Sequence, residues 1–178
     1  MRVLDVSNGR PGSIGPADRG VTYMEQSLVG GRLVQDRDLY ELDREDLEIV
    51  TDRCPNEGEI RSMIFAWPVV KHATSNAIAL VTGSETVGIG IGQVSRVDAV
   101  RIATLKADEH AMGKDADGSV MASDAFFPFP DGVEVAAESG ISAIVQPGGS
   151  MRDDEVIDAA NEHDIAMAFT GTRCFRHG

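Results

Sequence analysis

The sequence predicts an α/β fold in which helices cover both faces of a mixed β-sheet. Segments with the periodicity of amphipathic helices alternate with short apolar runs that are typical of buried strands. Two such runs, 141–145 and 165–169, flank a helix that starts near Ser150 and Asp153. A strand–helix–strand unit of this kind has parallel strands and a right-handed crossover.

The first part of the chain favours short strands. Residues 1–5 could form one, and 21–29 and 32–36 are separated by Gly30 and Gly31, as in a hairpin with a glycine turn. Residues 47–50 are expected to form one more short strand.

The first helix is predicted to begin after Pro55. Asn56 with Glu59 three residues later is a capping-box arrangement. Pro68 should kink this helix, because its ring removes a backbone donor. An apolar stripe follows the cap at helical spacing, and it should face a core: Ile60, Met63, Ile64, Trp67 and Val70.

Residues 76–81 and 85–91 then predict two strands, and Gly88, Gly90 and Gly92 leave one face of the second strand bare. Either another element or a ligand must approach that face closely. A dinucleotide site is disfavoured, because the glycine spacing differs from the known fingerprint. Ser95 and Asp98 predict the start of a helix from 96 to about 112. Four of its residues are expected to face the core: Val97, Val100, Ile102 and Leu105.

The segment 123–131 is the most unusual stretch, with three phenylalanines and two prolines between positions 126 and 130. The prolines exclude a regular strand and the rings cannot share one helix face, so at least one ring should line a groove or a partner. The alternative is a buried aromatic cluster. Asp131 is predicted to be the N-cap of a helix over 132–138. A carboxylate beside aromatic surface suits a flat, nitrogen-rich heterocycle.

Length and composition favour one cytoplasmic domain over residues 1–178. No apolar run reaches the roughly 18 residues of a membrane-spanning helix, and no signal peptide is recognised, so no membrane partner is expected. Cys54 and Cys174 lack the spacing of a zinc site or a disulfide framework.

The chain is strongly acidic, with 29 acidic against 16 basic residues and a net charge of -13. This charge disfavours nucleic acid as a partner, since a protein needs a basic surface to bind its phosphates. Many aspartates with few lysines are typical of a halophilic-type surface that stays soluble at high salt. An anionic ligand would have to be held by a few arginines and backbone N–H groups.

Several polar residues are candidates for chemistry. Lys71 and His72 could form a proton-transfer pair, since imidazole is the commonest general acid or base, or they could be a solvated helix end. Asn76 offers a neutral amide to a carbonyl or an oxyanion. Arg96 and Arg173 are candidate clamps for a phosphate or a carboxamide, although each alone could be a surface arginine.

No metal site is predicted. The four histidines have no ligand spacing, and the paired H-x-E and P-C-x-x-C motifs of zinc deaminases are missing. Nucleoside deamination is therefore disfavoured.

The motifs nevertheless resemble a known family. Matching segments are KHATSNAIAL, GIGIGQVSRVDAVRIA, SDAFFPFPDGVEVAAESGISAIVQPGG, RDDEVIDAANEHDIAMAFT and RCFRH. Together they are similar to the C-terminal half of the transformylase region of AICAR transformylase/IMP cyclohydrolase, a bifunctional purine-biosynthesis enzyme. The resemblance implies a cytidine-deaminase-like three-layer α/β/α lobe, the second of two. It also implies formyl transfer from the cosubstrate 10-formyltetrahydrofolate to AICAR, on the way to IMP.

The resemblance assigns residues to two ligands. For AICAR it implies contacts from Asn76, Arg96 and Arg173. For the folate it implies a border in which Phe126 packs on a ring and Asp131 accepts from the pterin nitrogens. The complete folate set is Val97, Phe126, Asp131, Ser150 and Met151.

The chain also departs from the family. The lysine–histidine pair to which the family assigns proton transfer lies in the first lobe, in a K-H-V-S-P-A-G stretch that this sequence lacks; Lys71 and His72 occupy the pseudo-equivalent place. The cyclohydrolase domain is absent, so no cyclohydrolase activity is expected. Pro68 and Pro130 stand where relatives usually carry basic residues.

Two functional hypotheses follow from these departures. The first is a transferase lobe whose missing lobe comes from a homo-oligomer or a separate polypeptide. The alternative is a non-catalytic lobe that binds ligand or completes a partner's active site. Some relatives also suggest a monovalent cation near the C-terminal segment.

Overall fold

The computed structural model describes residues 2–4, 23–36, 40–110 and 116–174. The chain forms two compact units, Met1–Tyr40 and Glu41–Gly178, and each is described by itself. Residues 175–177 of the RCFRH motif lie outside the described residues.

The first unit contains a three-stranded antiparallel sheet with the order β1-β3-β2. Its strands are β1 (Arg2–Leu4), β2 (Tyr23–Leu28) and β3 (Gly31–Asp36). The predicted hairpin is confirmed, and Gly30 turns the chain at φ +83°, a conformation that glycine adopts without steric cost.

The second unit contains a six-stranded mixed sheet with the order β4-β9-β8-β7-β5-β6. Neighbouring strands β7, β8 and β9 are parallel, and the remaining pairs are antiparallel. The strands are β4 (Glu48–Ile49), β5 (Ile78–Thr82), β6 (Glu85–Gly90), β7 (Val120–Ser123), β8 (Ala143–Gln146) and β9 (Ala166–Phe169).

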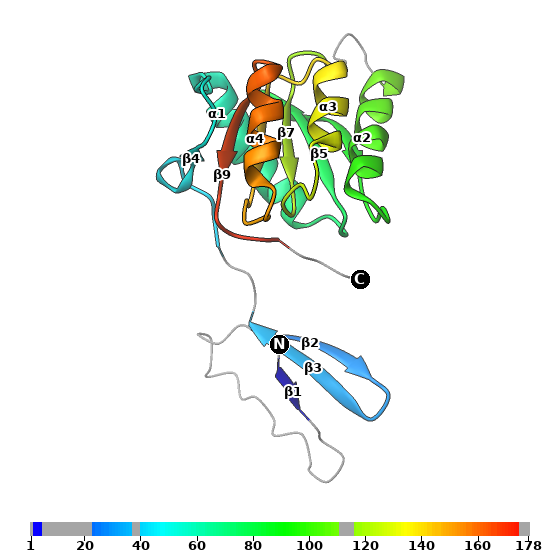
Figure 1. Cartoon of the computed structure of the whole chain (residues 1–178). Helices are drawn as coiled ribbons and strands as arrows, with labels where there is room; N and C mark the ends of the chain where they lie inside the picture. Colours follow the sequence, from blue (N-terminus) through cyan, green and yellow to red (C-terminus); the bar gives the residue numbers. More distant parts are fainter. Residues whose placement is uncertain (1, 5–22, 37–39, 111–115, 175–178) are drawn as a thin grey trace. The chain divides into compact units, whose positions relative to one another are not determined.

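Helices cover both faces of this sheet, which confirms the predicted α/β class. Helices α2, α3 and α4 lie side by side on one face, and α1 packs against β5, β7 and β8 from the other (Figure 1). Their bounds are α1 (Glu57–Lys71), α2 (Arg96–His110), α3 (Asp131–Glu138) and α4 (Asp153–Glu162), and a short 3-10 helix spans Arg44–Asp46.

The predicted β8–α4–β9 crossover is confirmed, and β7–α3–β8 repeats it. Strand β7 was not predicted. All four of its residues are buried in the middle of the sheet, so it lacks the alternation of polar and apolar residues that identifies a half-exposed strand.

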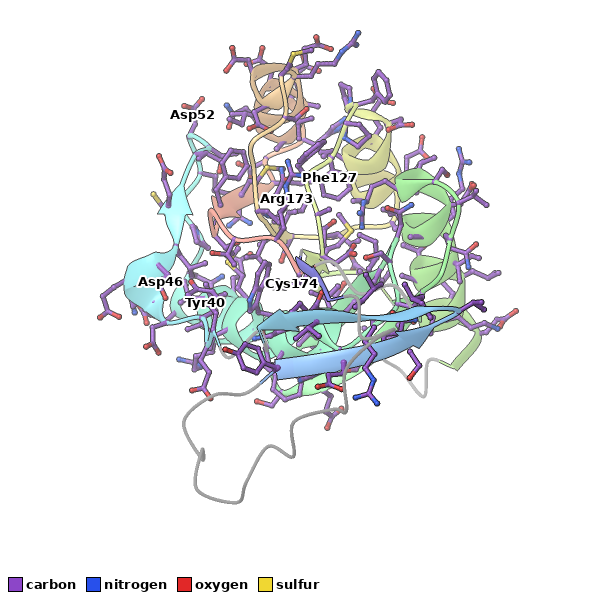
Figure 2. The ribbon with its side chains drawn as sticks, turned by 90° about the horizontal axis from the view of Figure 1, so that it is seen from below. Tyr40, Asp46, Asp52, Phe127, Arg173 and Cys174 are labelled. Carbon is purple, nitrogen blue, oxygen red and sulfur yellow. The ribbon has the colours of Figure 1, made fainter. Side chains whose placement is uncertain are left out.

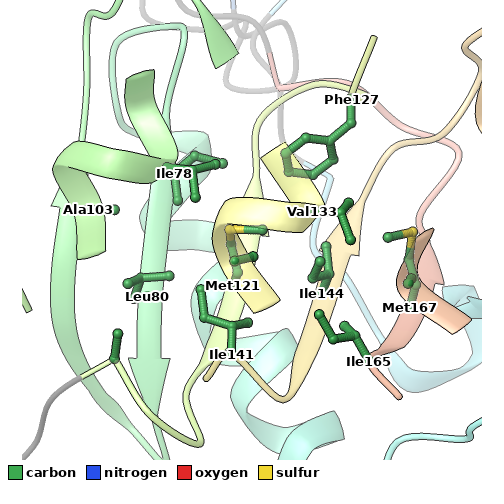
Figure 3. Packing of buried hydrophobic residues seen from close by; sticks show 14 of the residues in the cluster. Ile78, Leu80, Ala103, Met121, Phe127, Val133, Ile141, Ile144, Ile165 and Met167 are labelled. Atoms are coloured by element: carbon green, nitrogen blue, oxygen red, sulfur yellow. The ribbon is translucent and has the colours of Figure 1, made fainter. Parts of the chain in front are cut away.

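The main hydrophobic core lies between the sheet and helices α2 to α4. Figure 3 shows Met121, Ile144 and Met167 from three neighbouring strands in the same layer as Val133 of α3. All four side chains are fully buried.

The glycines of β6 are covered by a helix. A Cβ atom on Gly88 would lie 2.1 Å from the Ala103 carbonyl oxygen, and one on Gly90 would lie 2.0 Å from that of Ala99. For Gly88 and Gly90, close packing by α2 is therefore the correct one of the two explanations for the bare strand face. Such contact leaves room only for small side chains, so the prediction that Leu105 faces inward is wrong, and it is 52% exposed. Gly92 lies beyond the end of β6, where a Cβ atom would have no neighbour within 4 Å.

The starts of two helices also differ from the sequence prediction. Asp131 is the first residue of α3 and not its N-cap; Pro130 takes the N-cap position, and its φ of -66° is already helical. The Asp131 Oδ1 atom accepts from the N–H of Gly132 (2.8 Å). Ser150 accepts from the N–H of Arg152, so a turn precedes α4, which starts at Asp153.

The predicted capping box of α1 is confirmed, and it is part of a larger cluster. Asn56 accepts from the N–H groups of Gly58 (2.8 Å) and Glu59 (3.0 Å), and Glu59 accepts from the Asn56 N–H (2.7 Å). Glu59 also accepts two bonds from Arg53, whose guanidinium donates to the carbonyls of Ser142 and Asp164. The cluster therefore joins the start of α1 to the loops before β8 and β9.

We expect Glu59→Gln to lower the free energy of unfolding by about 1–3 kcal/mol at neutral pH. Burial raises the pKa of Glu59, but hydrogen bonds from Arg53, the Asn56 N–H and Ser142 lower it by more, so the net shift is downward. A group whose pKa is lower in the folded state stabilises the protein at pH values above its unfolded-state pKa. This stabilisation is lost as the pH falls through the folded-state pKa. The difference between variant and wild type should therefore shrink below about pH 4.5.

Denaturant unfolding followed by the fluorescence of Trp67, the one tryptophan of the chain, measures this difference. Glu57→Gln is the control, because Glu57 pairs with Arg44 through two bonds on the exposed surface and should have no measurable effect. Equal effects of the two substitutions at every pH would contradict the assignment.

Candidate functional site

A cavity of about 440 Å³ lies where β7 ends and where α2 and α3 begin. Loops at the carboxyl ends of parallel strands are the usual place for ligand sites in α/β proteins. Its wall consists of Asn76, Val94, Ser95, Arg96, Val97, Ala125, Phe126, Pro128, Phe129 and Asp131.

The phenylalanines of the Phe-Pro segment have different environments. Phe127 is fully buried, and its N–H donates to Gln146 Oε1 (3.1 Å). Phe126 and Phe129 line the cavity, and Phe129 is 48% exposed. The prediction that at least one ring lines a groove is confirmed, and the alternative of a buried aromatic cluster applies to Phe127 alone.

Each phenylalanine ring on the cavity wall is stacked with the guanidinium of an arginine. The guanidinium carbon of Arg173 lies 4.4 Å from the centroid of Phe126, and that of Arg152 lies 4.8 Å from the centroid of Phe129. Both distances fit cation–π stacking. Arg173 and Cys174 follow β9, on the segment labelled in Figure 2.

A buried ion pair forms the base of the site. Asp124 is fully buried directly after β7, and its carboxylate accepts from Arg96 Nη1, from the Ser75 hydroxyl and from the N–H of Ala77 (2.9 Å). Arg96 Nη1 also donates to the Ala77 carbonyl (3.0 Å). The backbone N–H of Cys174 donates to the Asp124 carbonyl (3.0 Å), which joins the C-terminal segment to the same point.

The ion pair fixes the predicted residue Asn76. Arg96 Nη2 donates to Asn76 Oδ1 (2.8 Å), and Asn76 Nδ2 donates to the carbonyls of Gln93 (2.9 Å) and Val94 (3.3 Å). The orientation of the Asn76 amide is therefore set by bonds on both its atoms. In Arg96, the buried Nε–H has no protein acceptor.

The electrostatic consequence is that the charge of Arg96 is balanced inside the protein. Its side chain is 5% exposed, and Asp124 lies in contact with it. The described cavity wall therefore presents a balanced charge at Arg96, the neutral amide of Asn76 and the exposed carboxylate of Asp131.

The remaining predicted residues lie in different places. Val97 and Asp131 line the cavity, whereas Ser150 and the fully exposed Met151 stand on the loop after β8 and are not part of its wall. Lys71 is the last residue of α1 and His72 its C-cap, and neither is among the lining residues.

Sequence reasoning missed Asp124 and Arg152. Asp124 is part of the unusual segment, but nothing in the local pattern indicates a buried partner 28 residues earlier. Arg152 stands beside the predicted pair Ser150 and Met151, and only the fold shows that it stacks on Phe129.

No group of three or more histidine, cysteine, aspartate or glutamate side chains that could hold a metal ion occurs among the described residues. Within the same ranges, no helix has the length and apolar character needed to cross a membrane.

Comparisons with known proteins agree with the motifs. The family model described as AICARFT/IMPCHase bienzyme matches residues 2–106. The bifunctional purine biosynthesis protein PurH of Magnetococcus marinus is 51% identical over 182 residues, which covers 99% of this chain. The chain spans 33% of that relative, about a third of its length.

We expect Asp124→Asn to destabilise the protein by about 3–5 kcal/mol, because it leaves the buried Arg96 guanidinium without a counter-charge. Glu155→Gln serves as the control, since it removes an exposed partner of Arg152 at 3.4 Å and should have little effect. Circular dichroism during denaturant unfolding measures both. Wild-type stability of Asp124→Asn would show that the ion pair is not a structural constraint.

Proposed function

This chain belongs to the AICAR transformylase/IMP cyclohydrolase family, and we propose that it is the second lobe of a transformylase. In this proposal the lobe has the cytidine-deaminase-like three-layer form, and it works with a first lobe supplied by another polypeptide. Together they transfer the formyl group of 10-formyltetrahydrofolate to the amine of AICAR.

One observation carries the proposal. A single cavity is lined by Asn76, Arg96, Val97, Phe126 and Asp131, which the family resemblance assigns to AICAR and to folate. These residues come from three stretches of the chain, and the packing of α2 and α3 against the sheet brings them to one wall.

The folate part of the site has the chemistry of a pterin pocket. Phe126 offers an aromatic face on which a flat ring can stack. Asp131 is an exposed carboxylate, and a carboxylate accepts hydrogen bonds from the N–H groups that line one edge of a pterin. Ser150 and Met151 border this part from the loop after β8 in the proposed complex.

The substrate part is divided by charge. Asp124 already balances Arg96, so Arg96 and Asn76 suit the neutral carboxamide of AICAR better than its phosphate. Arg173 stacks on Phe126 in the cavity wall, and a guanidinium has the fork of N–H donors that suits a phosphate, so we assign the dianionic phosphate to this residue.

Formyl transfer requires the AICAR amine to attack the formyl carbon of the folate. A C–N bond forms to the amine, the bond between the formyl carbon and folate N10 breaks, and a proton passes from the amine to N10. The cavity can contribute by positioning both ligands and by placing fixed dipoles next to the oxygen that becomes negative.

The proton-transfer group is expected to come from the partner lobe. Lys71 and His72 are not among the residues of the cavity wall, and the family's own lysine–histidine stretch is missing from this sequence. Exposed apolar side chains at the site, Val94 at 98% and Phe129 at 48%, are consistent with a surface that another polypeptide covers. The same observations leave the alternative of a non-catalytic lobe that completes a partner's site.

A monovalent cation beside the C-terminal segment is a further part of the proposal.

The decisive assay mixes this chain with a separately purified first lobe and follows conversion of AICAR to formyl-AICAR by mass spectrometry. We expect product from the mixture and none from either chain alone, because the base and the ligand pocket lie on different chains. A folded mixture that binds both ligands without turnover would favour the non-catalytic alternative.

Asp131→Ala should weaken folate binding by about tenfold, as expected for loss of hydrogen bonds to a charged acceptor. AICAR binding should change by less than about twofold, because Asp131 is assigned to the other ligand. Isothermal titration with each ligand separately measures both affinities. Glu134→Ala in the same helix is the matched control, and an equal loss of both ligands would refute the division into two pockets.

A further inference from the structure

Each of the two aromatic rings on the cavity wall is stacked with an arginine, but only one of these arginines has a proposed role. Arg173 on Phe126 is assigned to the phosphate of AICAR, whereas Arg152 on Phe129 is assigned to nothing. Because Phe129 belongs to the cavity wall, a cation stacked on its ring stands at the rim of the site.

The guanidinium of Arg152 remains available to a ligand. Its side chain is 50% exposed, and its side-chain partner in the described structure is Glu155 at 3.4 Å, an exposed pair of the kind that contributes little. Its backbone is held in place, since the N–H of Arg152 donates to Ser150 Oγ (3.1 Å). The stack on Phe129 adds a second restraint on the side chain, so less conformational entropy is lost when a ligand binds.

The size of the cavity indicates which part of a bound folate must lie at this rim. A volume of about 440 Å³ is near the lower end for small-molecule sites. It suffices for a pterin and the reacting groups, but an extended reduced folate also has an aminobenzoyl ring and a glutamyl chain. With the pterin next to Asp131, the glutamyl chain has to leave the cavity and lie along its rim.

The charge of the protein favours a fixed cation at this rim. The glutamyl chain carries carboxylates, the protein has a net charge of -13, and the first turn of α4 contains Asp153, Asp154 and Glu155. Arg96 is buried and balanced by Asp124. These acidic residues disfavour an anionic chain at this rim, and a cation that binds it directly offsets their repulsion.

We propose that Arg152 is a specificity residue that binds a carboxylate of the glutamyl chain of the folate. The planar guanidinium offers two parallel N–H donors to a carboxylate while its face stays stacked on Phe129. This inference rests on the proposed function, because it requires folate in the cavity, but it adds a determinant that distinguishes folates with and without the chain.

The test compares Arg152→Ala with the wild-type full chain in titrations with three probes: a reduced folate with three glutamates, the reduced pteroate that lacks the chain, and AICAR. Arg101→Ala is the matched control, since Arg101 is 60% exposed and pairs with Asp98 at the same 3.4 Å and the same spacing as Arg152 with Glu155, without a stacked ring. Both variants change the net charge equally.

We expect Arg152→Ala to weaken binding of the triglutamate about tenfold, with pteroate and AICAR within about twofold and with no effect of Arg101→Ala. The loss should decrease as the salt concentration rises, because salt screens a half-exposed ion pair. Arg152→Lys, which keeps the charge but not the planar stack, should give an intermediate loss.

Three outcomes would overturn the inference. Equal losses of triglutamate and pteroate would show that Arg152 only supports the Phe129 ring. Loss of AICAR affinity would assign the cation to the substrate phosphate, and no loss with any probe would leave Arg152 a surface residue. If the wild-type chain binds neither folate probe, the proposed function itself fails. If it binds both probes and Arg152→Ala binds them equally well, only the role of Arg152 fails.

Discussion

The buried ion pair between Arg96 and Asp124 is the constraint on which the site depends. Asp124 follows β7 and Arg96 is the first residue of α2, so the pair joins a central strand to a helix that covers the edge strand. An unpaired charge at either position would be very unfavourable in the interior. The same two residues fix Asn76 and contact the C-terminal segment, so the parts of the site cannot shift independently.

The packing of α2 on β6 sets the position of this pair. Gly88 and Gly90 bring the helix backbone so close to the strand that any side chain there would collide with a carbonyl oxygen. This contact places the start of α2, and with it Arg96 and Val97, next to the segment that follows β7. The glycines that could have suggested a nucleotide loop therefore act at a distance, by allowing the helix to approach the sheet.

The Phe-Pro segment contributes both to the hydrophobic core and to the cavity wall. Phe127 fixes the segment in the core, while Phe126 and Phe129 remain at the cavity. Phe126 is stacked with Arg173, which follows β9, and Phe129 with Arg152, which follows β8. The cavity thus brings together side chains from segments that follow β7, β8 and β9. Apolar side chains remain exposed at this cavity, among them Val94 and Phe129.

The sequence by itself determined the fold class, the crossover of β8 and β9, the capping box of Asn56 and the family, because these depend on local periodicity and on motifs. Only the tertiary structure decided that Leu105 faces outward, that β7 lies at the centre of the sheet, and that Arg96 is neutralised by Asp124. The reason is physical: burial and ion pairing join residues distant in the chain, and neither leaves a periodic signal around one position.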